Sequence, residues 1–134
     1  MDLRFRQEIL RWLAAVVGVC TGAMHVKTGI QALFTLSAKD GWTGLVGTLA
    51  AGFTLLPFSL LGFFRPRLAA YLLLGSFGVL VFALLFSGDL KSSFDVFRNG
   101  SFWLVYVLPF CGIAGVLLYA SNNNASAKTE CMMH

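Results

Sequence analysis

Charged residues are scarce in this sequence, and their scarcity excludes a soluble globular domain. Only 12% of the 134 residues are Asp, Glu, Lys or Arg, whereas 57% are hydrophobic. A typical soluble domain has about 25% charged residues, and a small one leaves a large share of its surface in water. A lipid bilayer removes this difficulty, because apolar side chains can face hydrocarbon. The composition therefore predicts an integral membrane protein, and the length fits one compact domain.

Catalytic and metal-binding motifs are also absent. The sequence has no HExxH motif, no P-loop, no Gly-rich dinucleotide turn and no Ser-His-Asp order. Its cysteines form no CxxC pair, so neither a disulfide framework nor a structural zinc site is indicated. The ten Lys and Arg stand singly between apolar runs, which argues against nucleic-acid binding. We expect no self-contained catalytic apparatus and no metal site. The three cysteines are Cys20, Cys111 and Cys131.

Four apolar runs are long enough to cross a bilayer, which needs roughly 20 apolar residues in a helix. Backbone groups in lipid must be satisfied within the segment, so each run is expected to be helical. We predict an all-α, four-helix transmembrane bundle over residues 1–120 and a polar, disordered tail over 121–134. The expected spans are about 9–36, 42–64, 68–87 and 101–120.

The first span is the least regular, because Lys27, Thr28 and Gly29 interrupt it. Either one long or kinked helix runs from about Ile9 to Leu36, or the piece after Gly29 lies along the membrane interface. We favour the long helix, with Lys27 near the outer boundary. Whether residues 30–40 form helix or loop stays open at this point.

The distribution of Lys and Arg predicts the orientation, because cytoplasmic loops carry an excess of these residues. With four spans, both termini and the turn after the second span share one side of the membrane. That side carries six of the ten, and the other side carries four. Both termini are therefore expected on the cytoplasmic side of a cell inner membrane or an organelle membrane. The six are Arg4, Arg6, Arg11, Arg65, Arg67 and Lys128, and the four are Lys27, Lys39, Lys91 and Arg98.

His25 is the sharpest candidate for a functional residue. Ionisable residues at membrane depth are costly and suggest function. A histidine there can shuttle protons, bind a quinone-like headgroup or ligate a metal, or it can simply bond to a neighbouring helix. Lys27 lies on a different helix face and either snorkels to the headgroups or takes part in a site. Thr21 and Thr28 complete the set of candidate polar ligands.

Glycines recur at helical spacing in the spans. Small residues at such spacing allow membrane helices to approach closely. We expect these glycines to pack the bundle, and self-association through one of their faces is an alternative. The set comprises Gly18 and Gly22 in the first span, Gly44 and Gly52 in the second, and Gly75 and Gly78 in the third.

One stretch resembles a known family. It reads Leu-Leu-Gly-Phe-Phe-Arg-Pro-Arg-Leu-Ala-Ala over residues 60–70 and joins the second and third spans. A second part of the pattern is the set of glycines that precede Lys27 near the end of the first span. Together with the four-span layout, it is similar to DoxX-like membrane proteins. The resemblance implies a role beside a membrane redox system, as a quinone-reactive or accessory subunit. Residues 42–45 read Trp-Thr-Gly-Leu, with no acid where many such relatives have a Glu, and this departure counts against direct catalysis.

Three functions remain after these observations. The leading one is a small accessory or structural subunit of a redox-linked membrane complex, in contact with lipid and with other subunits or itself. The second is a small transporter whose cavity is lined by His25, Thr21, Thr28 and the kink at Pro109. The third is an enzyme that acts on a lipid or quinone with His25 and Lys27. Quinone is the only cofactor that these alternatives suggest.

Overall fold

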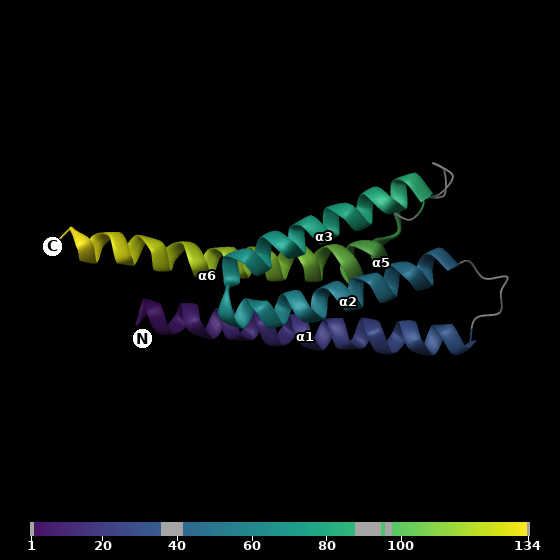
Figure 1. Cartoon of the computed structure of the whole chain (residues 1–134), viewed down its shortest axis with the longest axis horizontal. Coiled ribbons are helices and arrows are strands. Elements are labelled where there is room, and N and C mark those ends of the chain that lie inside the picture. Colours follow the sequence, from purple (N-terminus) through teal and green to yellow (C-terminus); the bar gives the residue numbers. More distant parts are fainter. Residues whose placement is uncertain (1, 36–41, 88–94, 96–97, 134) are drawn as a thin grey trace.

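The computed structural model describes residues 2–35, 42–87, 95 and 98–133, and nearly all of them are helical (Figure 1). Four of the helices are long and apolar enough to cross a membrane. This confirms the all-α, four-helix transmembrane bundle. In chain order the elements are α1 (Leu3–Thr35), α2 (Trp42–Phe64), α3 (Pro66–Ser87), α5 (Gly100–Phe102), the π-helix η1 (Trp103–Val107) and α6 (Leu108–Met132).

The four long helices close into a ring. The helix α1 packs against α2 and α6, and α3 packs against the same two helices from the opposite side. Successive helices run in opposite directions, so the two ends of the chain lie at the same end of the bundle (Figure 1). The shared side of the two termini agrees with the four-span prediction.

The turn between α2 and α3 is unusually tight. The Arg65 amide donates to the Leu61 carbonyl at 2.8 Å, and the Ala69 amide donates to the Arg65 carbonyl at 3.0 Å. Pro66 begins α3, a position where the missing N–H costs nothing and the fixed φ suits a helix. The third span therefore starts two residues before the predicted boundary at Leu68.

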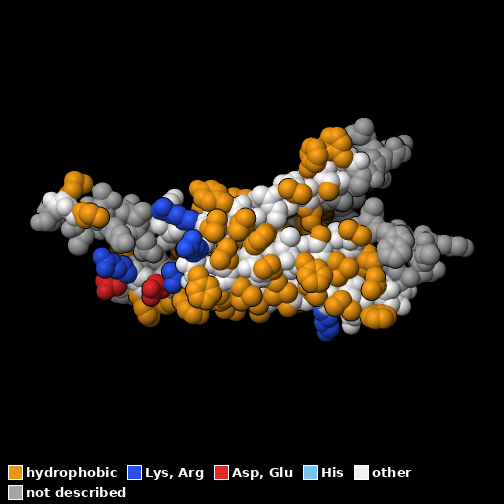
Figure 2. Space-filling model, viewed as in Figure 1, with side chains coloured by type: hydrophobic (Ala, Val, Ile, Leu, Met, Phe, Trp, Pro, Cys, Tyr) orange, Lys and Arg blue, Asp and Glu red, His pale blue; other side chains and the backbone are white. Residues whose placement is uncertain are grey.

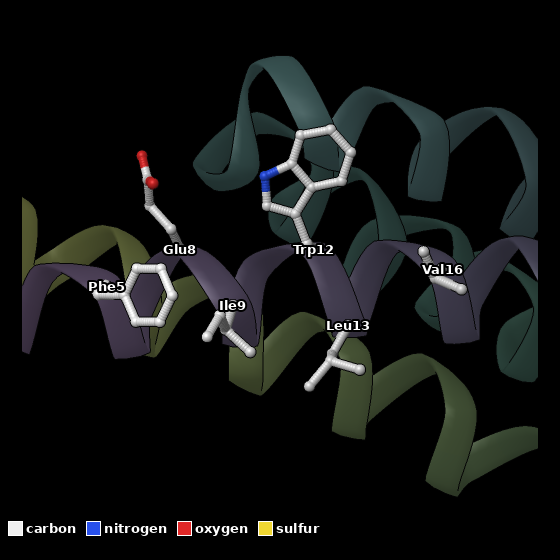
Figure 3. A pocket seen from close by; sticks show the side chains of 6 residues that line it. All are labelled: Phe5, Glu8, Ile9, Trp12, Leu13 and Val16. Carbon is white, nitrogen blue, oxygen red and sulfur yellow. The ribbon is translucent and has the colours of Figure 1, made fainter. Parts of the chain in front are cut away.

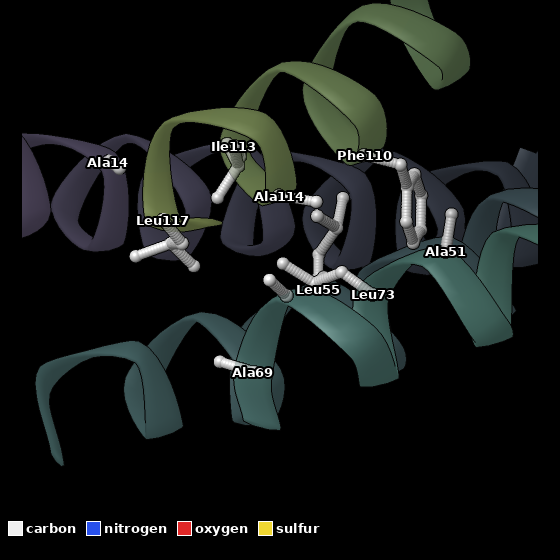
Figure 4. Close-up of a cluster of buried hydrophobic side chains, with 10 residues drawn as sticks. Ala14, Ala51, Leu55, Ala69, Leu73, Phe110, Ile113, Ala114 and Leu117 are labelled. Carbon is white, nitrogen blue, oxygen red and sulfur yellow. The ribbon is translucent and has the colours of Figure 1, made fainter. Parts of the chain in front are cut away.

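The core is built from alanines and a few large apolar side chains. Phe110, Leu55, Leu73 and Leu117 are the largest hydrophobic side chains that are fully buried. They come from α2, α3 and α6, and Ala14 joins them from α1 (Figure 4). Apolar side chains also cover the outside of the bundle (Figure 2), as expected where the surrounding solvent is hydrocarbon.

The helix α3 leans away from its neighbours toward its C-terminal end (Figure 1). Its fully buried residues, Ala69, Ala70 and Leu73, all lie in its first half. Val79, Phe82 and Phe86 in the second half are 62–74% exposed. The second half of α3 thus presents most of its surface to the membrane.

The helix α1 is continuous over 33 residues, which confirms the long-helix prediction and assigns residues 30–35 to it. Residues 36–40 lie outside the described part. At 1.5 Å per residue the helix is about 50 Å long, so it exceeds the hydrocarbon thickness of about 30 Å. It begins six residues before the predicted start at Ile9.

The C-terminal segment differs from the predicted disordered tail. The helix α6 continues without a break to Met132 and projects beyond the rest of the bundle (Figure 1). No Gly or Pro occurs after Gly115, and a helix already nucleated inside the membrane extends at little cost through Ala, Ser, Lys and Glu. The polarity of this segment therefore did not predict its helical structure.

Candidate functional site

One side of α1 carries the small and polar residues that meet the other helices. From Ala15 to Gly29 the buried residues recur at intervals of three and four along α1, as one helix face requires. The buried residues of α1 are Gln7, Ala14, Ala15, Gly18, Gly22, His25 and Gly29. The prediction that His25 shares a face with Gly18, Gly22 and Gly29 is confirmed.

Glycines on this face bring the backbones of α1 and α2 together. A Cβ atom on Gly22 would lie 2.9 Å from the Leu56 amide nitrogen. On Gly52 it would lie 2.8 Å from the Val26 amide nitrogen and 3.1 Å from the Gly22 carbonyl oxygen. These distances are too short for any real side chain, so glycine is required for this close approach.

His25 is held on this face by a bond within its own helix. It is 8% exposed, and its Nδ1 lies 2.8 Å from the Thr21 carbonyl oxygen. A carbonyl can only accept, so Nδ1 carries the hydrogen and Nε2 of the neutral ring is an acceptor. Nε2 is buried and has no hydrogen-bond partner among the described residues. In its neutral form His25 therefore offers one buried lone pair.

Tyr106 of η1 faces His25 across the bundle. The two rings meet edge to face, with centroids 5.7 Å apart. The Tyr106 hydroxyl lies 3.0 Å from Thr48 Oγ1 of α2, and its ring stacks on Phe102 at 5.4 Å. Polar groups from α1, α2 and η1 thus converge in one cluster, which we call the His25–Tyr106 cluster and define by His25, Thr48 and Tyr106.

A π-helix lies directly before Pro109, which has no N–H to continue the α-helical hydrogen-bond ladder. At its end, the Leu108 amide reaches back five residues to the Trp103 carbonyl. Such π-turns often occur at functional sites, and this one places Tyr106 against His25. The sequence located the proline but did not indicate Tyr106 or Thr48, because neither stands out from the polar residues common in membrane helices.

The other predicted polar residues do not join this cluster. Lys27 and Thr28 are exposed, and Lys27 lies on a different face from His25, as predicted. The half-buried Thr21 donates its hydroxyl to the Val17 carbonyl at 2.7 Å. Thr21 and Pro109 both line a groove between α1 and α6, but His25 and Thr28 are not among its lining residues. The cavity proposed around His25 for a transporter is therefore not formed by these four residues together.

The predicted packing glycines divide into two groups. A Cβ on Gly18 would collide with the buried Ser59 hydroxyl, so Gly18 packs as tightly as Gly22 and Gly52. Gly75 and Gly78 are exposed, and no other described part of the bundle lies within 4 Å of a Cβ placed on either. These two glycines lie on the outer face of α3 and do not bring described helices of this chain together, so the alternative of self-association through such a face stays a prediction. The surroundings of Gly44 lie outside the described side chains.

A shallow groove of about 340 Å³ runs along the outer face of α1 from Phe5 to Val16, and Glu8 is its one charged residue (Figure 3). Cys20 is exposed, Cys111 is half-buried, and both are free thiols. Within the described residues, no three His, Cys, Asp or Glu side chains come together as metal ligands would.

No protein-family model matches this chain, and neither the curated proteins nor the solved structures contain a match to it.

Proposed function

We propose that the protein is a small accessory subunit that packs against other proteins of a membrane complex and is not itself an enzyme. The observation that carries this proposal is the outer face of α3. Gly75 and Gly78 lie there, exposed and without a neighbouring atom where a side chain would begin.

Glycine is a costly choice for a helix surface that meets only lipid. In a helix interior it is about 1 kcal/mol less favourable than alanine. Inside this bundle, Gly22 and Gly52 offset that cost by bringing two backbones together. Small residues serve the same purpose at contacts between membrane proteins. The outward pair on α3 therefore supports the approach of a helix from another protein.

The side chains around the glycine pair fit this interpretation. Tyr71, Val79 and Phe82 are 62–70% exposed and border the two glycines on the same helix. Large side chains beside a glycine pair form a notch into which a partner helix can fit.

The redox setting is the second part of the proposal. It rests on the resemblance of residues 60–70 to DoxX-like proteins, which also suggests quinone as the cofactor of the complex. The buried lone pair of His25 offers a hydrogen-bond acceptor at membrane depth, but the described part of the chain forms no acid–base pair around it. This supports a subunit beside the redox chemistry more than an enzyme that performs it.

The experiment is purification of the tagged protein in a mild detergent from its native membrane. Native-gel mass, an ultraviolet–visible spectrum and mass spectrometry identify what accompanies it. We expect a larger assembly with haem, flavin or quinone signals. The double variant Gly75→Leu/Gly78→Leu should lose the partner, whereas Gly115→Leu should keep it, since Gly115 is an equally open, exposed glycine on α6. A colourless, partner-free protein would contradict the proposal.

A further inference from the structure

A groove of about 410 Å³ lies between α1 and α6, on a part of the surface that faces the membrane. One wall comes from α1 and includes Leu13 and Val17, which are 55% and 52% exposed. The other wall comes from α6 and includes Leu108, which is 66% exposed. The groove extends along α1 from Leu10 to Thr21, a distance of about 16 Å at 1.5 Å per residue.

The lining of the groove is apolar and therefore favours a hydrocarbon chain as its ligand. Thr21 is its only residue with a polar side chain, and that hydroxyl is already used, because it donates to the Val17 carbonyl at 2.7 Å. Gly112 keeps the α6 wall open, since no atom lies within 4 Å of a Cβ placed on it. A flexible apolar chain fits such a groove, and a ligand that needs hydrogen bonds does not.

Positive charge near one end of the groove favours a lipid with an anionic headgroup. Leu10 and Val116 line the end nearer the two termini, where Lys and Arg side chains gather (Figure 2). Arg11 follows Leu10 in α1 but is not one of the lining residues; it is half-buried, and its buried Nε has no hydrogen-bond partner among the described residues. On the α6 side, Arg67 donates to the Ser121 carbonyl at 3.3 Å, just beyond Val116.

The excess of positive charge at this end is clear among the described residues. Residues 2–11 at the start of the chain and residues 65–67 at the turn into α3 contribute five arginines and two acids. Basic residues at the level of the headgroups attract anionic lipid. The arginines are Arg4, Arg6, Arg11, Arg65 and Arg67, and the acids are Asp2 and Glu8.

We propose that the groove between α1 and α6 binds one acyl chain of an anionic phospholipid, whose phosphate is held by the arginine-rich end of the bundle. The acyl chain lies along Val17 and Gly112, and the phosphate lies at the arginine-rich end. This site is separate from the outer face of α3, so it stands or falls independently of the accessory-subunit proposal.

The test uses native mass spectrometry of the full-length protein in detergent. The protein is mixed with equal amounts of phosphatidylglycerol and phosphatidylcholine that carry identical acyl chains, and the lipid that remains bound after collisional removal of detergent is identified. We expect preferential retention of phosphatidylglycerol. Arg11→Gln should weaken that retention roughly fivefold, the effect typical of one basic residue near an anionic headgroup, and Arg11→Lys should preserve most of it.

Two variants test the groove itself. Gly112→Leu fills it from the α6 wall, and Val17→Trp fills it from the α1 wall, so one can replace the other if either fails to fold. Both should lose the bound phosphatidylglycerol. The control, Gly115→Leu, adds the same side chain to α6 outside the lining and should retain the lipid.

Three results would overturn the proposal. Equal retention of the two lipids by the unaltered protein would exclude selection of the headgroup. Equal retention by Gly112→Leu and Gly115→Leu would place the lipid elsewhere. A change in the number of protein chains in the Gly112→Leu species, with lipid retained, would instead assign the groove to a helix of a second protein.

Discussion

At the scale of single residues, the close approach of α1 and α2 depends on glycine at a few positions. At Gly52 the nearest atoms to a would-be Cβ belong to Val26, one of them a backbone nitrogen that cannot rotate away. Gly47 lies on the same helix and has no atom within 4 Å of its would-be Cβ. The two glycines therefore form a matched pair in which only the surroundings differ.

We expect Gly52→Ala to destabilise the protein by about 1–3 kcal/mol, because the added methyl group forces α1 and α2 apart. Gly47→Ala should leave the stability unchanged or raise it slightly, since alanine favours the helix. Unfolding in mixed detergent micelles, followed by circular dichroism, measures both. Equal stability of the two variants would mean that the helices separate without cost.

The bond between Tyr106 and Thr48 is the best-defined polar link between helices, with 3.0 Å between the hydroxyl oxygens. Interhelical hydrogen bonds in membrane proteins contribute about 0.6 kcal/mol on average. A double-mutant cycle with Tyr106→Phe and Thr48→Val should give a coupling free energy of that size. A coupling near zero would show that the two hydroxyls do not depend on each other.

The sequence predicts which residues share a helix face, but it does not predict which neighbouring helix that face meets. The shared face of His25 and three glycines followed from helical spacing alone. The partner of His25 did not, because Tyr106 is 81 positions further along the chain and its placement depends on how two helices rotate about their axes. The outward position of Gly75 and Gly78 could not be predicted for a related reason. In lipid both the inside and the outside of a bundle are apolar, so spacing does not reveal which face points inward.

At the scale of elements, the long helices are the most predictable part of the protein. The length and hydropathy of the apolar runs predicted four spans, and Pro66 predicted the turn between the second and the third. Helix ends outside the membrane were less predictable, as the last turns of α6 show. There, the polarity of the residues predicts disorder, whereas the lack of glycine and proline favours a continued helix. The structure shows the continued helix.

The last turns of α6 are expected to be separable from the bundle. Arg67 anchors α6 through the Ser121 carbonyl and Asn122 Oδ1, and the helix beyond projects away from the bundle. Truncation after Asn122 should therefore reduce helical circular dichroism but leave the melting temperature of the bundle unchanged. Arg67→Gln in the full-length chain serves as the contrast, because it removes the anchor and should lower that temperature by a few degrees. A truncated chain that melts much earlier would show that the projecting helix stabilises the bundle.

At the scale of the whole molecule, the fold places both termini at one end of the bundle (Figure 1). The side of the membrane on which that end lies is a prediction from the arginine distribution. Cys131 near the C-terminus allows a direct test, since Cys20 and Cys111 lie within the helices that cross the bilayer.

We expect a membrane-impermeant maleimide to label Cys131 in inside-out vesicles and not in intact cells, because the arginine distribution predicts cytoplasmic termini. Cys131→Ser should abolish that labelling and identifies the reactive thiol. Labelling of Cys131 in intact cells would reverse the orientation and place the five arginines of this end outside.

The turn at Arg65 and Pro66 has a consequence for biosynthesis. Only Arg65 separates α2 from α3, and backbone bonds already join it to both helices. With no spacer between them, α2 and α3 cannot lie far apart in the membrane once both have been translated. We therefore expect the two segments to insert together as a helical hairpin, before α6 has been synthesised.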